Sequence, residues 1–253
     1  MRLTRLYVDL SLAAGALLAL PAEAAAHVAR VLRGRGGDAI VLFNGDGREF
    51  DAVIDTVRGA RVEVAVTGVR SVDRESPLAL TLLQCVPRGD RMDWIVQKAT
   101  ELGVARIVPL ASERSLVRLD GKQAQSKAAH WRRVAAGACE QCGRNRLPVV
   151  ESPQPLVAYL GAALASGSRL LLEPDGARGA WSWRGGAAIE IAIGPEGGFT
   201  REELEAFRIT GFVGVRLGPR ILRVETAAIA ALTWLQTQFG DMAGAALAPA
   251  TTP

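Results

Sequence analysis

The first 70 residues alternate apolar and polar side chains, a pattern typical of strands with one buried face. Strands are predicted at residues 3–8, 39–43, 49–57 and 60–69. Residues 44–47 read NGDG and supply a hairpin turn between the second and third strands. Pro21 suits a first helical turn, and the spacing after it predicts a helix to about Arg33. Together these elements predict a small β-barrel.

Beyond about residue 76, nearly continuous apolar runs alternate with helical spacing. Strands are predicted at residues 78–86, 105–110, 168–174, 190–198 and 213–219, and helices at 92–103, 126–142 and 225–239. Buried strands of this kind are typical of a parallel sheet covered by helices, so the fold class is α/β. Residues 71–76 are charged and aperiodic. We therefore predict a first domain at 1–72, a second at 73–243 and a frayed tail at 244–253.

Two motifs near the N-terminus admit other interpretations. Residues 1–26 carry two arginines, an apolar run and a small-residue run, as a secretory signal peptide does. Asp9, Gly15 and Pro21 interrupt that pattern, so a strand and a helix are favoured and secretion is the alternative. Residues 34–39, GRGGDA, match the string G-x-G-x-x-A, but they follow a helix and precede a strand. A dinucleotide-binding turn needs the reverse order, so we interpret this segment as an ordinary turn.

Length and composition exclude several classes of protein. A chain of 253 residues is long enough for one or two domains, and 49% hydrophobic with 22% charged residues excludes wholesale disorder. No run of 18 apolar residues occurs, so no membrane span is expected. Three cysteines are too few, and odd in number, for a disulfide framework. We therefore expect a reducing compartment and a cytoplasmic protein.

The positive charge is concentrated in the middle of the chain. The formal charge is +1 for residues 1–72, +5 for 73–150 and −2 for 151–253. Of the 30 cationic residues 27 are Arg, the side chain suited to bidentate phosphate contact and to stacking on bases. A solvated basic face explains the composition equally well.

Three predicted strands of the second domain end in turns rich in Gly and Pro. These turns read LEP at residues 172–174, GPEGG at 194–198 and LGPRILR at 217–223. Ligands of open α/β sheets bind beyond the carboxyl ends of the strands, and glycines let the main chain approach a ligand closely. Thr200 and Glu203 form a T-x-x-E capping box behind the second turn. No Lys-Ser or Lys-Thr pair follows the glycines, so this turn is not a P-loop.

Polar residues on two predicted helices form a second candidate group. Gln97 and Glu101 are four residues apart and share a helix face, and Lys98 lies beside them. Glu140, Gln141 and Arg144 repeat this arrangement on or just after the later helix, and Arg114 adds a cation in the intervening loop. A solvated charged face is the ordinary interpretation of either helix.

Cys139 and Cys142 form a C-x-x-C motif. A zinc site needs two more ligands, and no second pair occurs at ligand spacing. A thioredoxin-type motif opens a helix, whereas this one lies near a helix end. We therefore predict no metal site and interpret both as core or near-surface thiols, with zinc and redox roles as the alternatives.

Long strings of this chain resemble one family. IAIGPEGGFTREEL, RLGPRILRVETAAIAAL, QKATELGVARIVPL and ACEQCGRNRLP resemble the RsmE family, the 16S ribosomal RNA uridine-N3 methyltransferases of the SPOUT class. HVARVLRGRGGDAIVLFNGDGREFDA is similar to that family's PUA-like barrel. The resemblance implies a C-terminal SPOUT domain with a trefoil knot, a homodimer, S-adenosylmethionine as cofactor, and 16S ribosomal RNA or the small ribosomal subunit as partner. It implies neither a metal nor a membrane.

The resemblance also implies roles for the candidate residues. The cofactor-binding residues would be Leu172, Glu173, Gly194, Glu196, Gly197, Gly198, Leu217, Gly218, Ile221, Leu222, Arg223, Thr226 and Ala227. Arg223 is expected to stabilise the uracil anion, and Glu101, Glu140 or Glu225 to accept the N3 proton. The residues expected to contact the substrate are Gln97, Lys98, Arg114, Gln141 and Arg144.

Two other functions compete with this interpretation. An RNA-binding ribosome-assembly protein with a vestigial pocket is one, although the intact glycine turn speaks against it. A thiol oxidoreductase that uses Cys139 and Cys142 is the other. Binding of S-adenosylmethionine distinguishes the first, and a double Cys→Ser variant distinguishes the second.

Overall fold

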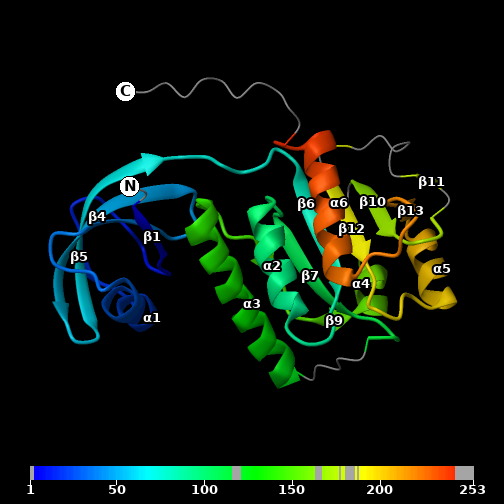
Figure 1. Cartoon of the computed structure of the whole chain (residues 1–253), viewed down its shortest axis with the longest axis horizontal. Coiled ribbons are helices and arrows are strands. Elements are labelled where there is room, and N and C mark those ends of the chain that lie inside the picture. The colour runs from blue at the N-terminus through cyan, green and yellow to red at the C-terminus, as the bar shows by residue number, and fades with distance from the viewer. Residues whose placement is uncertain are drawn as a thin grey trace. The chain divides into compact units, whose positions relative to one another are not determined.

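The computed structural model describes residues 3–115, 121–162, 167–176, 178–179, 186 and 188–242. The chain divides into two compact units (Figure 1). Unit 1 comprises Met1–Glu75 and Ala136–Leu147, and unit 2 comprises Ser76–Ala135 and Pro148–Pro253. The boundary predicted from the sequence falls close to residue 75, but residues 136–147 pack with the N-terminal part of the chain. The tail predicted at 244–253 lies outside the described residues.

Unit 1 is built on a five-stranded sheet in the order β1-β3-β4-β5-β2. Its strands are β1 (Thr4–Tyr7), β2 (Leu17–Ala19), β3 (Ala39–Phe43), β4 (Arg48–Arg58) and β5 (Arg61–Ser71). The predicted alternation is confirmed in β5, where Val62, Val64 and Val66 are buried and point into the core of this unit. Helix α1 (Ala22–Ala26) continues as a π-helical segment (His27–Leu32) that ends at Arg33, so the predicted helix is also confirmed.

The sheet of unit 1 differs from the predicted four-stranded barrel in two respects: it has one more strand, and it is not closed by hydrogen bonds. The segment predicted as a loop before Pro21 contains β2, which pairs antiparallel with β5. β2 has only three residues, too few for alternation to show in the sequence. In the described residues no pairing joins β1 to β2, so hydrogen bonds do not close the sheet into a barrel. Register shifts at Asp51/Ala52 and Ile54/Thr56 mark bulges in the long β4–β5 ladder.

Unit 2 contains a parallel sheet in the order β11-β13-β10-β12-β6-β7-β8, with β9 also paired to β7. Its strands are β6 (Ala79–Cys85), β7 (Arg106–Ala111), β8 (Val149–Val150), β9 (Gln154–Pro155), β10 (Ser168–Leu172), β11 (Arg178–Gly179), β12 (Ala188–Ile193) and β13 (Val213–Arg216). Every pairing given for this sheet is parallel, which confirms the prediction. The short strands β8, β9 and β11 were not predicted.

Helices cover both faces of this sheet. They are α2 (Arg91–Glu101), α3 (Gly121–Cys142, whose last residues belong to unit 1), α4 (Leu156–Ala162), α5 (Arg201–Ile209) and α6 (Val224–Phe239). Neighbouring strand residues face opposite cores: Leu82 packs with residues of α2 and α6, and Leu83 packs with residues of α4 and α5. Helix α3 begins five residues before the predicted start, and α4 was not predicted. No helix in the described ranges combines the length and apolarity that crossing a membrane requires.

Candidate active site

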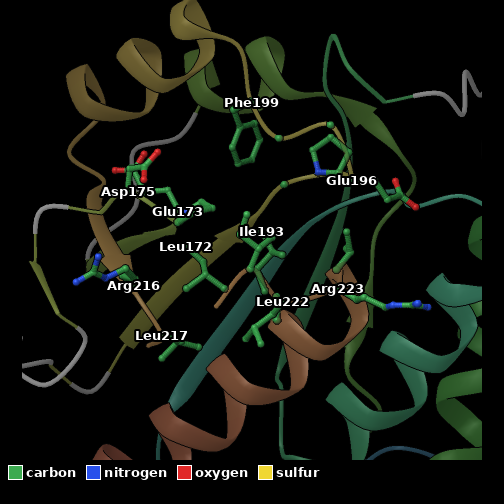
Figure 2. Close-up of a pocket in the computed structure, with 18 of the residues that line it drawn as sticks. Leu172, Glu173, Asp175, Ile193, Glu196, Phe199, Arg216, Leu217, Leu222 and Arg223 are labelled. Atoms are coloured by element: carbon green, nitrogen blue, oxygen red, sulfur yellow. The ribbon is translucent and has the colours of Figure 1, made fainter. Parts of the chain in front are cut away.

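A cavity of about 780 Å³ lies at the carboxyl ends of β10, β12 and β13 (Figure 2). The three turns identified in the sequence contribute most of its wall. The lining residues are 172–175, 193–199, 216–217, 220–224 and Ala227, with Arg91, Leu204 and Arg208 from helices α2 and α5. The fold therefore brings together three segments that are separated in the chain by 16 or 17 residues.

Most of the predicted cofactor residues line this cavity. All of them do except Gly218 and Thr226. Gly218 has a φ of +73° and shapes the turn after β13, and Thr226 is an exposed residue one position before Ala227. Sequence reasoning missed the three lining residues from helices, because helix periodicity does not indicate which end of a helix approaches a strand turn. It also missed Arg216 and Arg220, although they flank or lie within the third turn.

The turn at residues 194–198 depends on its glycines. The Gly198 N–H donates to the Pro195 carbonyl at 2.9 Å, and Gly198 has a φ of +65°, which favours glycine. A Cβ at Gly194 would lie 3.0 Å from the ring of Phe199. The predicted capping box at Thr200 and the start of α5 is confirmed, because both of its hydrogen bonds form. The turn thus runs into a fixed helix start.

Three arginines from other parts of unit 2 contact this turn, one of them only through its main chain. Arg91 Nη1 donates to Glu196 Oε1 at 2.6 Å, and the Arg88 backbone N–H donates to the same oxygen at 3.2 Å. Arg114 Nη1 donates to the carbonyl oxygens of Gly197 at 3.0 Å and Phe199 at 3.2 Å. Arg114, expected to contact the substrate, is thus bonded to the main chain of the turn.

Charged side chains stand at two ends of the cavity. Figure 2 shows Glu173, Asp175 and Arg216 at one end, and Glu196 and Arg223 at the other, with Leu172, Leu217 and Leu222 between them. Glu173 Oε2 lies 3.8 Å from Arg208 Nη2. This arrangement suits an elongated ligand with polar ends and an apolar middle.

The expected catalytic residues lie in different places. Arg223 lines the cavity and precedes α6; its carbonyl accepts the Ala227 N–H at 2.7 Å, whereas its guanidinium makes no hydrogen bond or ion pair with the described residues. Glu225 lies two residues after Arg223. The buried Oε2 of Glu225 has no hydrogen-bond partner in the described part of the chain, but it lies 3.9 Å from Arg91 Nε. Glu101 is bonded to Lys98 at 2.8 Å. Arg91, at the start of α2, lines the cavity, and Glu101 is ten positions later at the end of this helix. At the helical rise the two residues are about 15 Å apart, so Glu101 lies at the opposite end of α2 from the cavity.

The remaining expected residues do not join the cavity. Gln97 lies on α2 beside Lys98, and Glu140, Gln141 and Arg144 belong to unit 1. Glu140 accepts the Tyr7 backbone N–H at 2.9 Å, and burial raises the pKa of this carboxyl.

Arg144, expected to contact the substrate, pairs with a carboxylate inside unit 1. It is only 4% exposed and contacts Glu75 through its Nη2 at 2.5 Å. Its sequence position after a helix gave no sign of this pairing, because Glu75 is far away in the chain. Gln141 is exposed.

Cys139 of the C-x-x-C motif does not show the features of a reactive thiol. Cys139 is fully buried, and its Sγ donates to the Arg146 carbonyl at 3.6 Å. A hydrogen bond with Cys142 and burial both raise the pKa of Cys139. In the part of the chain that the structure describes, no group of three potential metal ligands occurs.

A parallel sheet with a cavity at its carboxyl edge is typical of a ligand-binding α/β domain, and comparison with known families identifies this one as an RNA methyltransferase domain. Residues 74–236 match the model of an RNA methyltransferase domain, and residues 20–63 match that of an RNA methyltransferase PUA domain. The chain belongs to the ribosomal RNA small subunit methyltransferase E family, as its resemblance to RsmE proteins predicted.

Relatives and solved structures cover nearly the whole chain. The ribosomal RNA small subunit methyltransferase E of Buchnera aphidicola is 30% identical over 95% of this chain and 98% of its own length, and that of Bacillus subtilis is 32% identical over 84% and 86%. The enzyme of the same name from Neisseria gonorrhoeae, solved with S-adenosylmethionine, is 36% identical, with a TM-score of 0.88 over 95% of this chain and 99% of that one. A Legionella pneumophila structure with the same cofactor is 41% identical, with a TM-score of 0.92 over 95% and 100%.

Proposed function

We propose that this protein transfers a methyl group from S-adenosylmethionine to N3 of a specific uridine in the 16S RNA of the small ribosomal subunit. The observation that carries this proposal is the cavity formed by three strand-end turns. It lies in a chain that is similar over 95% of its length to structures that hold this cofactor.

The residues of the cavity fit this cofactor. Its middle is apolar, and the turn at 194–198 presents main-chain atoms that can pair with the edge of an adenine. Gly194 allows Phe199 to pack against the turn, since a Cβ at 194 would lie 3.0 Å from that ring. Carboxylates and arginines at the two ends suit hydroxyl groups and an amino acid moiety. When bound, S-adenosylmethionine supplies an electrophilic methyl group, so the chain needs no metal for this chemistry.

The chain's own residues prepare the uracil. N3 must lose its proton before it can form a bond to carbon, and the base then carries negative charge. Arg223 lines the cavity without an ionic partner among the described residues, so its guanidinium is available to stabilise that charge. Glu225, two residues away, has an oxygen with no hydrogen-bond partner in the described chain, and we assign it the role of proton acceptor.

We also propose a homodimer in which helices of one copy complete the site of the other. Gln97 and Lys98 are partly exposed on α2 and do not line the cavity of their own chain. In a dimer, these residues and Glu101 would lie at the cavity of the second copy. In the same assembly Gln141 and Arg144 would orient the substrate, and Glu140 stays an alternative proton acceptor.

Two further features accompany the proposed activity. We propose that the C-terminal unit is knotted, which is consistent with a sheet order that places β10 between β12 and β13 and with the meeting of three turns at one cavity. The proposed substrate is ribosomal RNA, which together with three free cysteines supports a cytoplasmic location.

Mass spectrometry of RNA nucleosides tests the proposal. Small subunits and naked 16S RNA from a strain that lacks this activity are incubated with the protein and S-adenosylmethionine. We expect one new 3-methyluridine, on at least one of the two substrates, and none with Gly194→Val, whose side chain would collide with Phe199 and close the cavity. Absence of methyluridine from both substrates, with RNA binding retained, would support an assembly protein with a vestigial pocket instead.

A further inference from the structure

The glycine turn at residues 194–198 must keep one shape to hold a ligand. Glycine has more backbone freedom than any other residue, and freedom that remains in the unbound turn must be lost on binding, which weakens affinity. Only one main-chain hydrogen bond given for this segment, from Gly198 to Pro195, lies within the turn. Contacts from outside the turn therefore decide how well it is preorganised.

Arg91 supplies the first outside contact. It is the first residue of α2, and its guanidinium bonds to Glu196 at 2.6 Å. Its Nε also lies 3.9 Å from Glu225 of α6. The side chains of Arg91 and Glu196 are 41% and 31% exposed, so solvent only partly screens the pair. One side chain thus connects the starts of two helices with the turn.

Arg114 supplies the second outside contact, through the main chain rather than a side chain. Its Nη1 bonds to two carbonyl oxygens, those of Gly197 and Phe199. A Cβ at Gly197 would lie 3.4 Å from the Cβ of Arg114, so the arginine packs directly against the glycine. This contact orients the peptide groups that follow Gly197 and Phe199.

We propose that Arg91 and Arg114 are positioning residues that clamp the cofactor turn from two sides before the cofactor arrives. Glu196 then acts as the attachment point of the clamp rather than primarily as a cofactor ligand. This inference rests on the proposed function only in taking S-adenosylmethionine as the ligand, and it does not depend on which RNA is methylated.

Cofactor affinity and amide exchange test the clamp. We expect Arg91→Gln and Arg114→Gln each to weaken S-adenosylmethionine binding by about fivefold in calorimetry. In the protein without cofactor, hydrogen exchange of the peptide containing Gly198 should quicken by a similar factor. Arg201→Gln is the matched control. Arg201 is also the first residue of a helix and is exposed, and its side chain makes no hydrogen bond or ion pair with the described residues. It should change either quantity less than twofold.

Further variants separate positioning from general destabilisation. Glu196→Gln breaks the Arg91 bond from the other side, so combining it with Arg91→Gln should weaken binding no more than either change alone. Arg91→Lys keeps the charge and should recover part of the affinity. Circular dichroism of each variant shows whether it folds. If Arg91→Gln does not fold, Glu196→Gln still removes the same contact and serves as the test.

Unchanged affinity and unchanged exchange in both arginine variants would overturn the clamp. If Arg114→Gln lowers only the affinity for RNA, Arg114 does not position the turn and is a substrate contact instead. Failure of the proposed function looks different: the wild-type protein would bind S-adenosylmethionine and respond to the arginine variants, yet methylate no ribosomal RNA.

Discussion

Arginine serves different purposes in the two units. In unit 1, Glu49 is buried and contacts three arginines: Arg5, Arg70 at 3.3 Å and Arg74 at 2.7 Å. In unit 2, the guanidinium groups of the pocket residues Arg216, Arg220 and Arg223 make no hydrogen bond or ion pair with the described residues. The first group has its charge compensated inside the protein, whereas the second is available to an anion from outside. A count of arginines cannot distinguish these roles, but their partners can.

The largest expected effect comes from breaking the compensated group. Replacing Glu49 by Gln leaves Arg5, whose side chain is 7% exposed, without its counter-charge. Breaking a buried ion pair in this way costs about 3 kcal/mol in the free energy of unfolding. Glu63→Gln is the control, because the Arg61 side chain of its ion pair is 71% exposed and the change should cost less than about 1 kcal/mol.

Spectroscopy can assign this loss to unit 1. All five tryptophans lie in unit 2, so fluorescence reports that unit, whereas circular dichroism reports both. In urea, Glu49→Gln should lower the midpoint seen by circular dichroism more than the midpoint seen by fluorescence, with the affinity for S-adenosylmethionine unchanged. Equal shifts of both midpoints would show that the two units unfold together, contrary to this expectation.

The same pair predicts a dependence on pH. Burial is the largest influence on Glu49 and raises its pKa, but hydrogen bonds and charge from Arg74 and Arg5 outweigh it, so the folded pKa is lowered. A lowered folded pKa gives stability that is complete above the unfolded value of about 4.3 and is lost as pH falls through the folded value. The stability difference between wild type and Glu49→Gln should therefore shrink below about pH 4.

The next largest effect is expected at the cavity arginines, whose guanidinium groups have no ionic partner among the described residues. Arg223→Gln removes the cation that we assign to the uracil anion, so kcat should fall by about 10² to 10³, as when one stabilising donor is removed from an anion site. Cofactor affinity should change less than threefold, because the charge matters mainly when the base is deprotonated. Arg208→Gln, at the same cavity but beside Glu173, is the comparison. Equal losses of kcat and cofactor affinity in Arg223→Gln would make it only a binding residue.

The sequence predicted those features that depend on local pattern. The long strands of both units, the capping box at Thr200 and the turns that line the cavity all follow from periodicity or from Gly and Pro positions. It did not predict β2 or α4, whose short spans carry too little pattern, nor the pairing of Arg144 with Glu75. Arg91 and Arg114 show the same limit, because a clamp on a turn depends on tertiary contacts that no local pattern encodes.

A smaller effect is expected from the exposed arginines of the cavity. Arg216→Gln and Arg220→Gln should each weaken RNA binding less than about tenfold. Each should also reduce the slope of log affinity against log salt by about 1, because one phosphate contact fewer releases fewer counterions. Binding of a 16S RNA fragment at several salt concentrations measures both quantities. Arg48→Gln is the control, because its guanidinium is already bonded to Asp46 and its removal should leave the slope unchanged.

The smallest effect is expected from the C-x-x-C motif in unit 1. Its Cys139, like the arginines around Glu49, is buried and bonded to other groups inside the protein. Cys139 is buried and its pKa is raised by the hydrogen bond with Cys142 and by burial, so it supplies little thiolate at neutral pH. Replacing both cysteines by Ser keeps hydroxyls that can hydrogen-bond, and methyl transfer should change less than about twofold, with or without dithiothreitol. Cys85→Ser is the control for a buried thiol outside the motif. Loss of all activity in the double variant alone would establish thiol chemistry and would assign the reactive centre to unit 1 rather than to the cavity of unit 2.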